Sequence, residues 1–421
     1  MRFLSQATAV IKILVAAVWA IPVHSEGMKK SLRPNVRPVD EVVLNEVGNI
    51  AFNRWIDDYR ARAMEAGISQ NVLEQALHGV QYNTSVIQKD RNQSEFTKTL
   101  WDYLDTAVSD LRIKNGRAAL KTYATALDQV EQVYGVDKQI IAAIWGLESA
   151  YGKFRGSIPV IEAMATLAHD GRRAAFFEEQ LTAALTILQS GDVALEQMLG
   201  SWAGAMGHTQ FMPTSFLLHS VDFTQDGKRD IWSDDPRDAL ASTAAYLKTN
   251  GWVLGQPWGI EVKLPETFDF LMARRETVLK PSEWAKLGVV DINDDPIPDY
   301  GTAAVLLPAG ADGAAFLVFN NFRVLETYNT ADAYVIGVGH LADRIDGGDA
   351  IQSAWPREDR ALTYDERVEL QKRLTSNGFD TQKIDGLIGP LTIEAVRQFQ
   401  KSINMKPDGY ASMRILKLLR P

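Results

Sequence analysis

The hydrophobic pattern of the chain is helical over most of its length. Apolar residues recur at three- and four-residue spacings from about Val42 to Asn115, which predicts helical structure there. The same spacing predicts one further helix from Gly116 towards Gly135. Further helices are predicted with the same spacing in VDKQIIAAIWGLESAYG, IPVIEAMATLAHD, GRRAAFFEEQLTAALTILQSG and DDPRDALASTAAYLKTNGW. A loop rich in glycine and proline lies before the last of these.

The pattern changes in the last third of the chain. Between Trp258 and Tyr328, alternating β-branched residues and turn signals predict short strands. A helix is predicted in ADAYVIGVGHLADRI, and the segment that follows, DGGDAIQSAWPREDRA, has the composition of a linker. Residues 361–421 predict three short helices, the first opened by the capping-box sequence TYDE, with an Asp-Gly turn repeated between them. We therefore expect a mainly α protein with minor β structure, followed by a separate three-helix unit.

Composition and charge narrow the class of protein. With 421 residues, 46% of them hydrophobic and 23% charged, the chain is a globular protein of two or three domains. The net charge of −9 argues against nucleic acid as a partner, since nucleic-acid binders usually carry a basic field. There is no cysteine, and therefore no disulfide and no thiolate metal ligand.

The N-terminal segment predicts export. Arg2 and Lys12 precede an uncharged run from Ile13 to Val23, which is shorter than the ~20 apolar residues of a membrane span and fits a signal peptide cleaved after Ser25. An uncleaved anchor is the alternative. No later segment is apolar enough to span a bilayer, and the chain lacks the cysteine of a bacterial lipoprotein. We expect a periplasmic protein with a signal peptide over residues 1–25 and no membrane span in its mature form.

One glutamate lies in an apolar helical segment, GLESAYG. On a helix, Ile144, Trp145 and Tyr151 fall on the same side as Glu148. A carboxylate on that side loses hydration, so it either has a cationic partner or its pKa rises until it is protonated near neutrality. A protonated glutamate in an apolar cleft is a good general acid. Glu148 is thus a candidate acid, and a glutamate paired at the rim of the core is the alternative.

The segment GSWAGAMGHTQFMPTS combines close-packing glycines with polar and aromatic side chains. Ser201, Thr209 and Gln210 supply hydrogen-bonding groups among aromatic and Met residues. This mixture suits a sugar, which presents hydroxyls at its edges and C–H groups on its faces. A tight structural loop is the alternative.

The segment DFTQDGKRDIWSDDPRD has the spacing of an EF-hand loop at its start, with Gly227 at the turn and Ser233 in place of the usual final glutamate. The candidate oxygen ligands are Asp222, Thr224, Asp226, the carbonyl of Lys228, and a later carboxylate, Asp238. Oxygen ligands suit Ca²⁺ or Na⁺ rather than Zn²⁺. The ion would be structural, with no cofactor required for chemistry, and a solvated acidic turn is the alternative.

Four motifs together resemble the lytic murein transglycosylase B family of bacterial cell-wall enzymes: GLESAYGKFRG, SWAGAMGHTQFMPTSF, VDFTQDGKRDIWSDDPRDALASTAAYLKTNGW and YNTADAYVIGVGHLAD. The likeness covers roughly Val42 to Ile345. The C-terminal unit resembles the small peptidoglycan-binding domain through LQKRL, GFDTQKIDGLIGPLTIEAVRQFQ and PDGYAS. Both parts point to peptidoglycan.

The resemblance implies a lysozyme-like, mainly α catalytic domain over residues 40–345, a linker over 346–360 and a peptidoglycan-binding domain over 361–421. It places the family's catalytic glutamate on Glu148 and its calcium loop on the five residues named above. The family's sugar contacts fall on Ser201, Gln210, Tyr246, Asn329, Tyr334 and Tyr103. Two extra residues in WSDDPRD precede Asp238, so Asp234 or Asp235 could replace it as a ligand.

With Glu148 as the single acid, the expected reaction is a lytic transglycosylation. Glu148 protonates the oxygen between N-acetylmuramic acid and N-acetylglucosamine, then accepts the proton of the C6 hydroxyl as that oxygen attacks C1 and forms a 1,6-anhydro ring. A lysozyme-type hydrolase would need a second carboxylate, for which Asp170 is one candidate. A cell-wall-binding scaffold without activity is the third hypothesis. Peptidoglycan strands are the expected partner, with cell-wall synthesis enzymes as further candidates.

Overall fold

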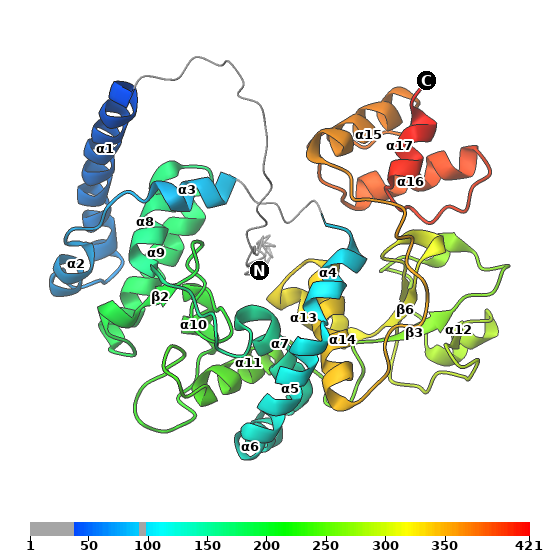
Figure 1. The fold of residues 1–421 in the computed structure, drawn as a ribbon, viewed down its shortest axis with the longest axis horizontal. Helices are drawn as coiled ribbons and strands as arrows, with labels where there is room; N and C mark the ends of the chain where they lie inside the picture. Colours follow the sequence, from blue (N-terminus) through cyan, green and yellow to red (C-terminus); the bar gives the residue numbers. More distant parts are fainter. Residues whose placement is uncertain (1–37, 92–97) are drawn as a thin grey trace, which may run out of the picture. The chain divides into compact units, whose positions relative to one another are not determined.

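The structure is a computed structural model that describes residues 38–91 and 98–421 (Figure 1). The predicted signal peptide lies outside these residues. The described chain forms two compact units, one made of residues 38–91 and 144–246 and the other of residues 98–143 and 247–421. Within the described ranges, no helix combines the length and the apolar character that a bilayer crossing requires.

The unit formed by residues 38–91 and 144–246 is helical. Its central helices α8 (Val160–Asp170) and α9 (Ala174–Ser190) pack along each other and are surrounded by shorter helices. The surrounding elements are α1 (Pro38–Glu65), α2 (Gln70–Leu77), α3 (Thr84–Arg91) and α10 (Pro213–His219). A two-stranded antiparallel sheet, β1 (Ile158–Pro159) with β2 (Leu199–Gly200), and the 3-10 turn η2 (Leu195–Gln197) complete it. Helices α7 (Lys138–Ser149) and α11 (Arg237–Thr249) have residues in both units.

The other unit contains a helical part and a sheet. Helix α14 (Asp332–Asp346) packs against α4 (Leu100–Ala107), α5 (Asp110–Thr122) and α13 (Asn320–Tyr328). The predicted strands form an antiparallel sheet in the order β4-β3-β6-β5. Their bounds are β3 (Gly259–Lys263), β4 (Val290–Asp291), β5 (Ala304–Leu306) and β6 (Ala315–Val318). The sheet packs on a core that includes the fully buried Trp284 of α12 (Pro281–Lys286), with η3 (Phe270–Met272) beside it.

The single helix predicted from Gly116 towards Gly135 is wrong. The structure has α5 ending at Thr122 and α6 (Ala124–Tyr134) starting two residues later, because Tyr123 leaves helical geometry with φ −108° and ψ 25°. Hydrogen bonds nevertheless continue on both sides of Tyr123. The apolar spacing therefore runs through the break, and periodicity alone does not reveal it.

The three predicted C-terminal helices are confirmed as α15 (Tyr364–Ser376), α16 (Pro390–Ser402) and α17 (Met413–Leu419), with a core of their own. The predicted capping box is present, with Thr363 accepting from the Glu366 amide and Glu366 accepting from the Thr363 amide. These helices also contact the sheet region of the same unit. The Arg397 side chain, on α16, donates to the carbonyl of Ala273 at 2.6 Å.

Candidate active site

Glu148 is the penultimate residue of α7 and is 6% exposed. Its helical neighbours Ile144 and Trp145 are buried as well. The prediction that this carboxyl group is buried among apolar side chains is therefore confirmed. The C-terminal end of a helix carries the negative end of the helix dipole, which disfavours an anion at this position.

The chain reverses sharply after Glu148. Ala150, Tyr151 and Gly152 are consecutive residues with positive φ, at 51°, 60° and 83°. Positive φ in the two non-glycine residues is uncommon and strained. The reversal folds the Tyr151 ring over Gly146, where an added Cβ would lie 2.6 Å from the ring. A glycine inside this helix is thus explained by the tyrosine that packs on it.

Ser149, the last residue of α7, is hydrogen-bonded to the predicted sugar-binding loop. Ser149 Oγ donates to the carbonyl of His208 at 2.5 Å and accepts the amide of Gly152 at 2.9 Å. The His208 ring is also fixed, because Nδ1 accepts from Trp145 Nε1 at 3.1 Å and Nε2 lies 2.7 Å from the carbonyl of Ser233. These partners assign a neutral ring with its proton on Nε2.

Arg155 makes polar contacts on the Nε2 side of the His208 ring. Its guanidinium donates to the carbonyl of Ser233 and pairs with Asp234 at 2.7 Å. It also comes within 3.3 Å of His208 Nε2, but both nitrogens carry protons directed at the Ser233 carbonyl, so this contact is not a hydrogen bond. Burial lowers the pKa of His208, and the positive charge of Arg155 lowers it further, against the opposing effects of the Ser233 carbonyl, Asp230 and Asp234.

Ser201 and Gln210 each stabilise the loop that carries them. Ser201 Oγ accepts the amides of Ala203 and Ala205 at 3.3 and 3.1 Å. Gln210, at φ 53°, donates through Nε2 to the carbonyls of Arg155 and Gly207. These two bonds fix the orientation of the amide, and no bond from a described residue to its Oε1 is seen. The structural and the sugar-binding interpretations of the loop are therefore compatible.

Tyr246 of α11 belongs to the same unit as Glu148, Ser201 and Gln210. Its ring packs 6.0 Å from the Phe211 ring and 4.6 Å from the His219 ring. Phe211 in turn pairs through its backbone with Met206. The structure thus connects the segments that carry Glu148, Ser201, Gln210 and Tyr246. Asp170, the candidate second carboxylate, is held by Arg91 at 2.8 Å and by the Tyr82 hydroxyl.

The remaining predicted sugar contacts belong to the other unit. Tyr103 lies on α4, Asn329 ends α13, and Tyr334 lies on α14. The Asn329 side chain accepts the amide of Ala331 at 3.1 Å, and the Tyr334 ring is stacked parallel to the Tyr328 ring, with centroids 6.5 Å apart. All three residues therefore lie on or beside the packed helices α4, α13 and α14.

The residue that fixes the corner between α13 and α14 was not among the residues predicted from the sequence. Arg275 forms ion pairs with Glu326 of α13 and Asp332 of α14, one on each side of Asn329. Its guanidinium also lies 5.4 Å from the centroid of the Phe322 ring. Because Arg275 is far from this corner in the sequence, no local pattern could have predicted its position.

The predicted ion loop brings three carboxylates together. Ligand oxygens of Asp222, Asp226 and Asp238 lie within 4.8 Å of one another. Asp222 accepts the amide of Gly227 at 2.8 Å, as the first residue of an EF-hand-like turn does. Asp238 accepts three backbone amides of the loop, including that of Thr224 at 2.9 Å.

The structure places Asp238, and not Asp234 or Asp235, beside the other two carboxylates. Asp234 is paired with Arg155 and Asp235 with Arg237, so neither extra residue replaces it. Burial raises the pKa of Asp238, the loop amides oppose this, and the nearby charge of Asp222 raises it further. A hard cation bound to this oxygen-only donor set would neutralise the repulsion, so the residues fit Ca²⁺. Lys228 would contribute its carbonyl and Thr224 its hydroxyl.

Comparisons with known proteins agree with this geometry. Residues 51–343 match the Transglycosylase SLT domain family, and residues 363–419 match a Putative peptidoglycan binding domain. Membrane-bound lytic murein transglycosylase B of Escherichia coli (strain K12) is 29% identical over 295 residues, which cover 66% of this chain and 79% of that protein.

Solved structures extend the likeness. SltB3 from Pseudomonas aeruginosa in complex with NAG-anhNAM-pentapeptide is 46% identical, with a TM-score of 0.86 over 88% of this chain and 99% of that one. The Escherichia coli lytic transglycosylase Slt35 in complex with calcium is 28% identical, with a TM-score of 0.60 over 71% of this chain and 93% of that one. The lysozyme-like catalytic fold and the C-terminal peptidoglycan-binding domain are thus confirmed. The chain belongs to the SLT transglycosylase family and is a peptidoglycan lytic transglycosylase.

Proposed function

We propose that this enzyme cleaves the β-1,4 bond between N-acetylmuramic acid and N-acetylglucosamine and leaves 1,6-anhydromuramyl ends, with Glu148 as the single general acid and base. The observation that carries the proposal is the buried Glu148 carboxyl at the end of α7, in a chain of this family. The complex of the relative SltB3 with NAG-anhNAM-pentapeptide supports the anhydro product.

The proposed reaction needs one proton and no water. Glu148 gives its proton to the glycosidic oxygen, and the bond from that oxygen to C1 breaks. The carboxylate then takes the proton of the C6 hydroxyl, and O6 forms the new bond to C1. Because the substrate supplies its own nucleophile at a high effective concentration, neither a second carboxylate nor a cofactor is required.

We propose that other polar and aromatic residues bind the glycan around the bond that Glu148 cleaves. The residues proposed to contact the glycan are Ser201, Gln210, Tyr246, Asn329, Tyr334 and Tyr103. Gln210 is suited to this because its nitrogen is fixed by two carbonyls while its oxygen accepts no described donor. Asp170 is less suited to a hydrolytic role, since Arg91 and Tyr82 already use its carboxylate.

The ion loop is proposed to bind Ca²⁺ through Asp222, Thr224, Asp226, the carbonyl of Lys228, and Asp238. The ion would supply positive charge that holds the loop, and it takes no part in proton transfer. The calcium complex of the relative Slt35 supports the choice of metal. We further propose that residues 346–360 connect the catalytic domain to a sacculus-binding domain over 361–421, and that the enzyme works in the periplasm after removal of residues 1–25.

The decisive experiment analyses the products of digested sacculi by mass spectrometry. Wild-type enzyme should yield 1,6-anhydromuramyl ends, whereas reducing ends alone would indicate lysozyme-type hydrolysis. Glu148→Gln keeps the shape of the side chain but has no transferable proton, so it should bind sacculi without turnover. Turnover by this variant at the wild-type rate would contradict the role of Glu148, and a wild type without turnover would indicate a binding scaffold.

A further inference from the structure

The C-terminal domain contains one structural motif twice. A helix carries a buried glutamine, an Asp-Gly turn follows, and the next helix begins four residues after the glycine. The glutamines are Gln371 of α15 and Gln400 of α16, which are 1% and 2% exposed. The turns that they hold are Asp385-Gly386 and Asp408-Gly409, which we call the first and the second turn.

The hydrogen bonds of the first turn define the motif. Gln371 Oε1 accepts the amide of Gly386 at 2.8 Å, and Gln371 Nε2 donates to Asp385 Oδ1 at 3.2 Å. The same Oδ1 accepts the amide of Leu387 at 2.9 Å. The turn is therefore built from one oxygen of its aspartate, and the second oxygen takes no part.

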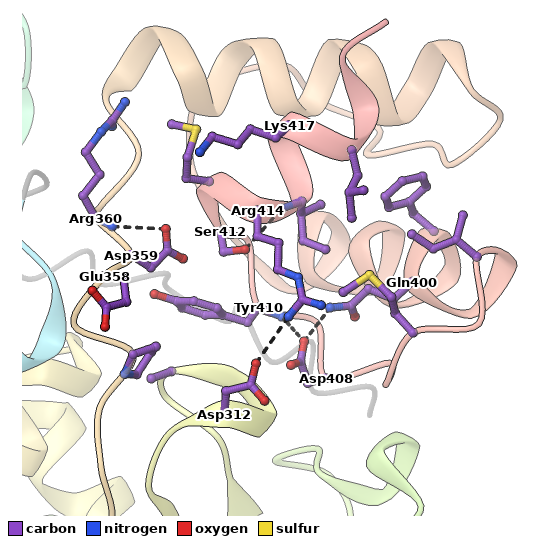
Figure 2. A pocket seen from close by; sticks show the side chains of 18 residues that line it. Asp312, Glu358, Asp359, Arg360, Gln400, Asp408, Tyr410, Ser412, Arg414 and Lys417 are labelled. Carbon is purple, nitrogen blue, oxygen red and sulfur yellow. Dashed lines mark hydrogen bonds and ion pairs between the residues drawn. The ribbon is translucent and has the colours of Figure 1, made fainter.

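The second turn repeats these bonds. Gln400 Oε1 accepts the amide of Gly409 at 2.8 Å. Gln400 Nε2 donates to Asp408 Oδ1 at 2.6 Å (Figure 2), and Tyr410 donates its amide to the same oxygen at 2.9 Å. Leu387 and Tyr410 thus occupy equivalent positions, each directly after its glycine. Each aspartate uses Oδ1 within its turn, and the other oxygen, Oδ2, which we call the outer oxygen, takes no part in these bonds.

The second turn is occupied by a peptide from the catalytic domain. Asp408 Oδ2 accepts the amide of Ala311 at 2.8 Å, in the 3-10 turn η4 (Gly310–Asp312). Tyr410 packs directly on Gly310, where an added Cβ would lie 2.8 Å from the Tyr410 Cβ. Gly310 is also held at φ 72°, so this close approach requires glycine. In the second turn the motif therefore binds a backbone N–H through Oδ2 of its aspartate. The residue directly after its glycine, Tyr410, covers the small residue Gly310.

A cavity of about 1040 Å³ lies beside this contact, as Figure 2 shows. Two of the arginines that line it are already paired with carboxylates. Arg414 pairs with Asp312, and Arg360 pairs with Glu366. The cavity is thus part of the contact between the C-terminal domain and η4, and the second turn is not open to a ligand.

The first turn has the same acceptor and is open. Asp385 is exposed, and among the described residues no other residue donates to its Oδ2. Leu387, in the place of Tyr410, is 59% exposed, and the Tyr364 ring that packs on Gly386 is 57% exposed. Ile384 and Leu391 are exposed beside them. This site offers one anionic acceptor beside an apolar rim. Two cations are also close to the turn: the charge of Lys383 acts on Asp385, and Arg367 donates to the Gly386 carbonyl at 2.6 Å.

We infer that the first turn binds the stem peptide of peptidoglycan, with Asp385 Oδ2 accepting a backbone N–H and Leu387 and Tyr364 covering small side chains. The inference rests on the proposed peptidoglycan-binding role of this domain and adds its site and ligand. A peptide fits better than a sugar because the equivalent turn already holds a Gly-Ala peptide. The single acceptor and the apolar rim would also leave most sugar hydroxyls without partners.

The test uses the full chain with Glu148→Gln, so that no substrate is consumed. Binding of a fluorescently labelled stem pentapeptide without sugars is compared with binding of a peptide-free N-acetylglucosamine oligosaccharide. Asp385→Asn keeps an oxygen for the internal bonds but can turn an NH₂ group towards the ligand, so pentapeptide affinity should fall about tenfold or more. Oligosaccharide affinity should not change.

Asp408→Asn is the matched control, since it makes the same chemical change in the occupied turn. It should lower the melting temperature by weakening the contact with Ala311 while leaving pentapeptide affinity unchanged. Equal pentapeptide binding by Asp385→Asn and its parent, or an equal loss for the oligosaccharide, would overturn the inference. A second measurement separates this failure from a failure of the proposed function. If deletion of residues 361–421 leaves pelleting with sacculi unchanged, the domain does not bind peptidoglycan at all.

Discussion

His208 provides the sharpest test of how the candidate site is held together. Replacing it with phenylalanine keeps an aromatic ring of similar size but removes both ring nitrogens. Trp145 would lose the acceptor of its indole N–H, which lies 3.1 Å from His208 Nδ1. The carbonyl of Ser233 would keep a donor, because Arg155 also reaches it at 2.5 Å. The net loss is therefore one buried hydrogen bond that leaves a donor without its acceptor.

Leaving a buried donor unsatisfied costs about 1–3 kcal/mol, so we expect His208→Phe to lower the free energy of unfolding by about 2 kcal/mol. For a unit of this size that corresponds to a fall in melting temperature of about 4–8 °C. The kcat should fall more than KM changes, because a ring that has lost its partners no longer fixes the backbone of residue 208, whose carbonyl accepts from Ser149 next to Glu148. His208→Gln is the control, because its amide can accept from Trp145 and donate to Ser233.

The same ring predicts the direction of a pH effect. Burial lowers the pKa of His208 in the folded protein below the ordinary value of 6.5, so near pH 6 the unfolded chain binds more protons than the folded one. This contribution to stability is complete above about pH 6.5 and is lost as the pH falls through the folded pKa. Thermal unfolding should show a component of this slope in the wild type that is absent in His208→Gln. Identical pH profiles for the two proteins, or an unchanged melting temperature for His208→Phe, would refute the account.

Three further outcomes are expected. Calcium should raise the melting temperature of the chelator-treated enzyme in a concentration-dependent way, and Asp238→Asn should greatly reduce the shift; no shift in the wild type would mean that the loop is only an acidic turn. Arg275→Ala should raise KM for glycan fragments several-fold by loosening the corner that carries Asn329 and Tyr334, with a smaller effect on kcat, and equal kinetics would exclude this positioning role. The ion pair with Arg360 and the capping box with Thr363 lower the pKa of Glu366 to about 2. The ionised Glu366 therefore stabilises the fold above about pH 4.5, and this stabilisation is lost as the pH falls towards 2. Glu366→Gln should remove that pH dependence from acid unfolding curves. The change in the free energy of unfolding should be less than about 1 kcal/mol, because the ion pair is partly exposed.

The features that the sequence predicted best are encoded within a few consecutive residues. The helical period placed Glu148 on an apolar face, and the structure buries it there. The sequence TYDE specified the capping box at Thr363 because both partners lie within one turn of helix. The spacing of the ion loop likewise brought Asp222 and Asp226 together, since an EF-hand-like turn depends on local geometry.

Features that depend on distant partners were out of reach. The sequence left Asp234, Asp235 and Asp238 as alternatives for the last ion ligand, and only the structure shows that Asp234 is already paired with Arg155, far from it in the chain. The position of Arg275 between two helices depends in the same way on tertiary packing. Local patterns can name the residue types of a site, but the choice among equivalent residues is made by packing.

The reversal after Glu148 shows why this site could not be built from local preference. Two non-glycine residues with positive φ cost of the order of 1–3 kcal/mol each, and glycines at both positions would avoid most of that cost. The chain instead has Tyr151, whose ring needs this backbone to lie on Gly146 and meets the Trp145 ring edge-on at 5.7 Å. The Ser149 contacts with Gly152 and the loop stabilise the same reversal. The strain is therefore the consequence of packing aromatic rings around the end of α7, where the buried Glu148 also lies.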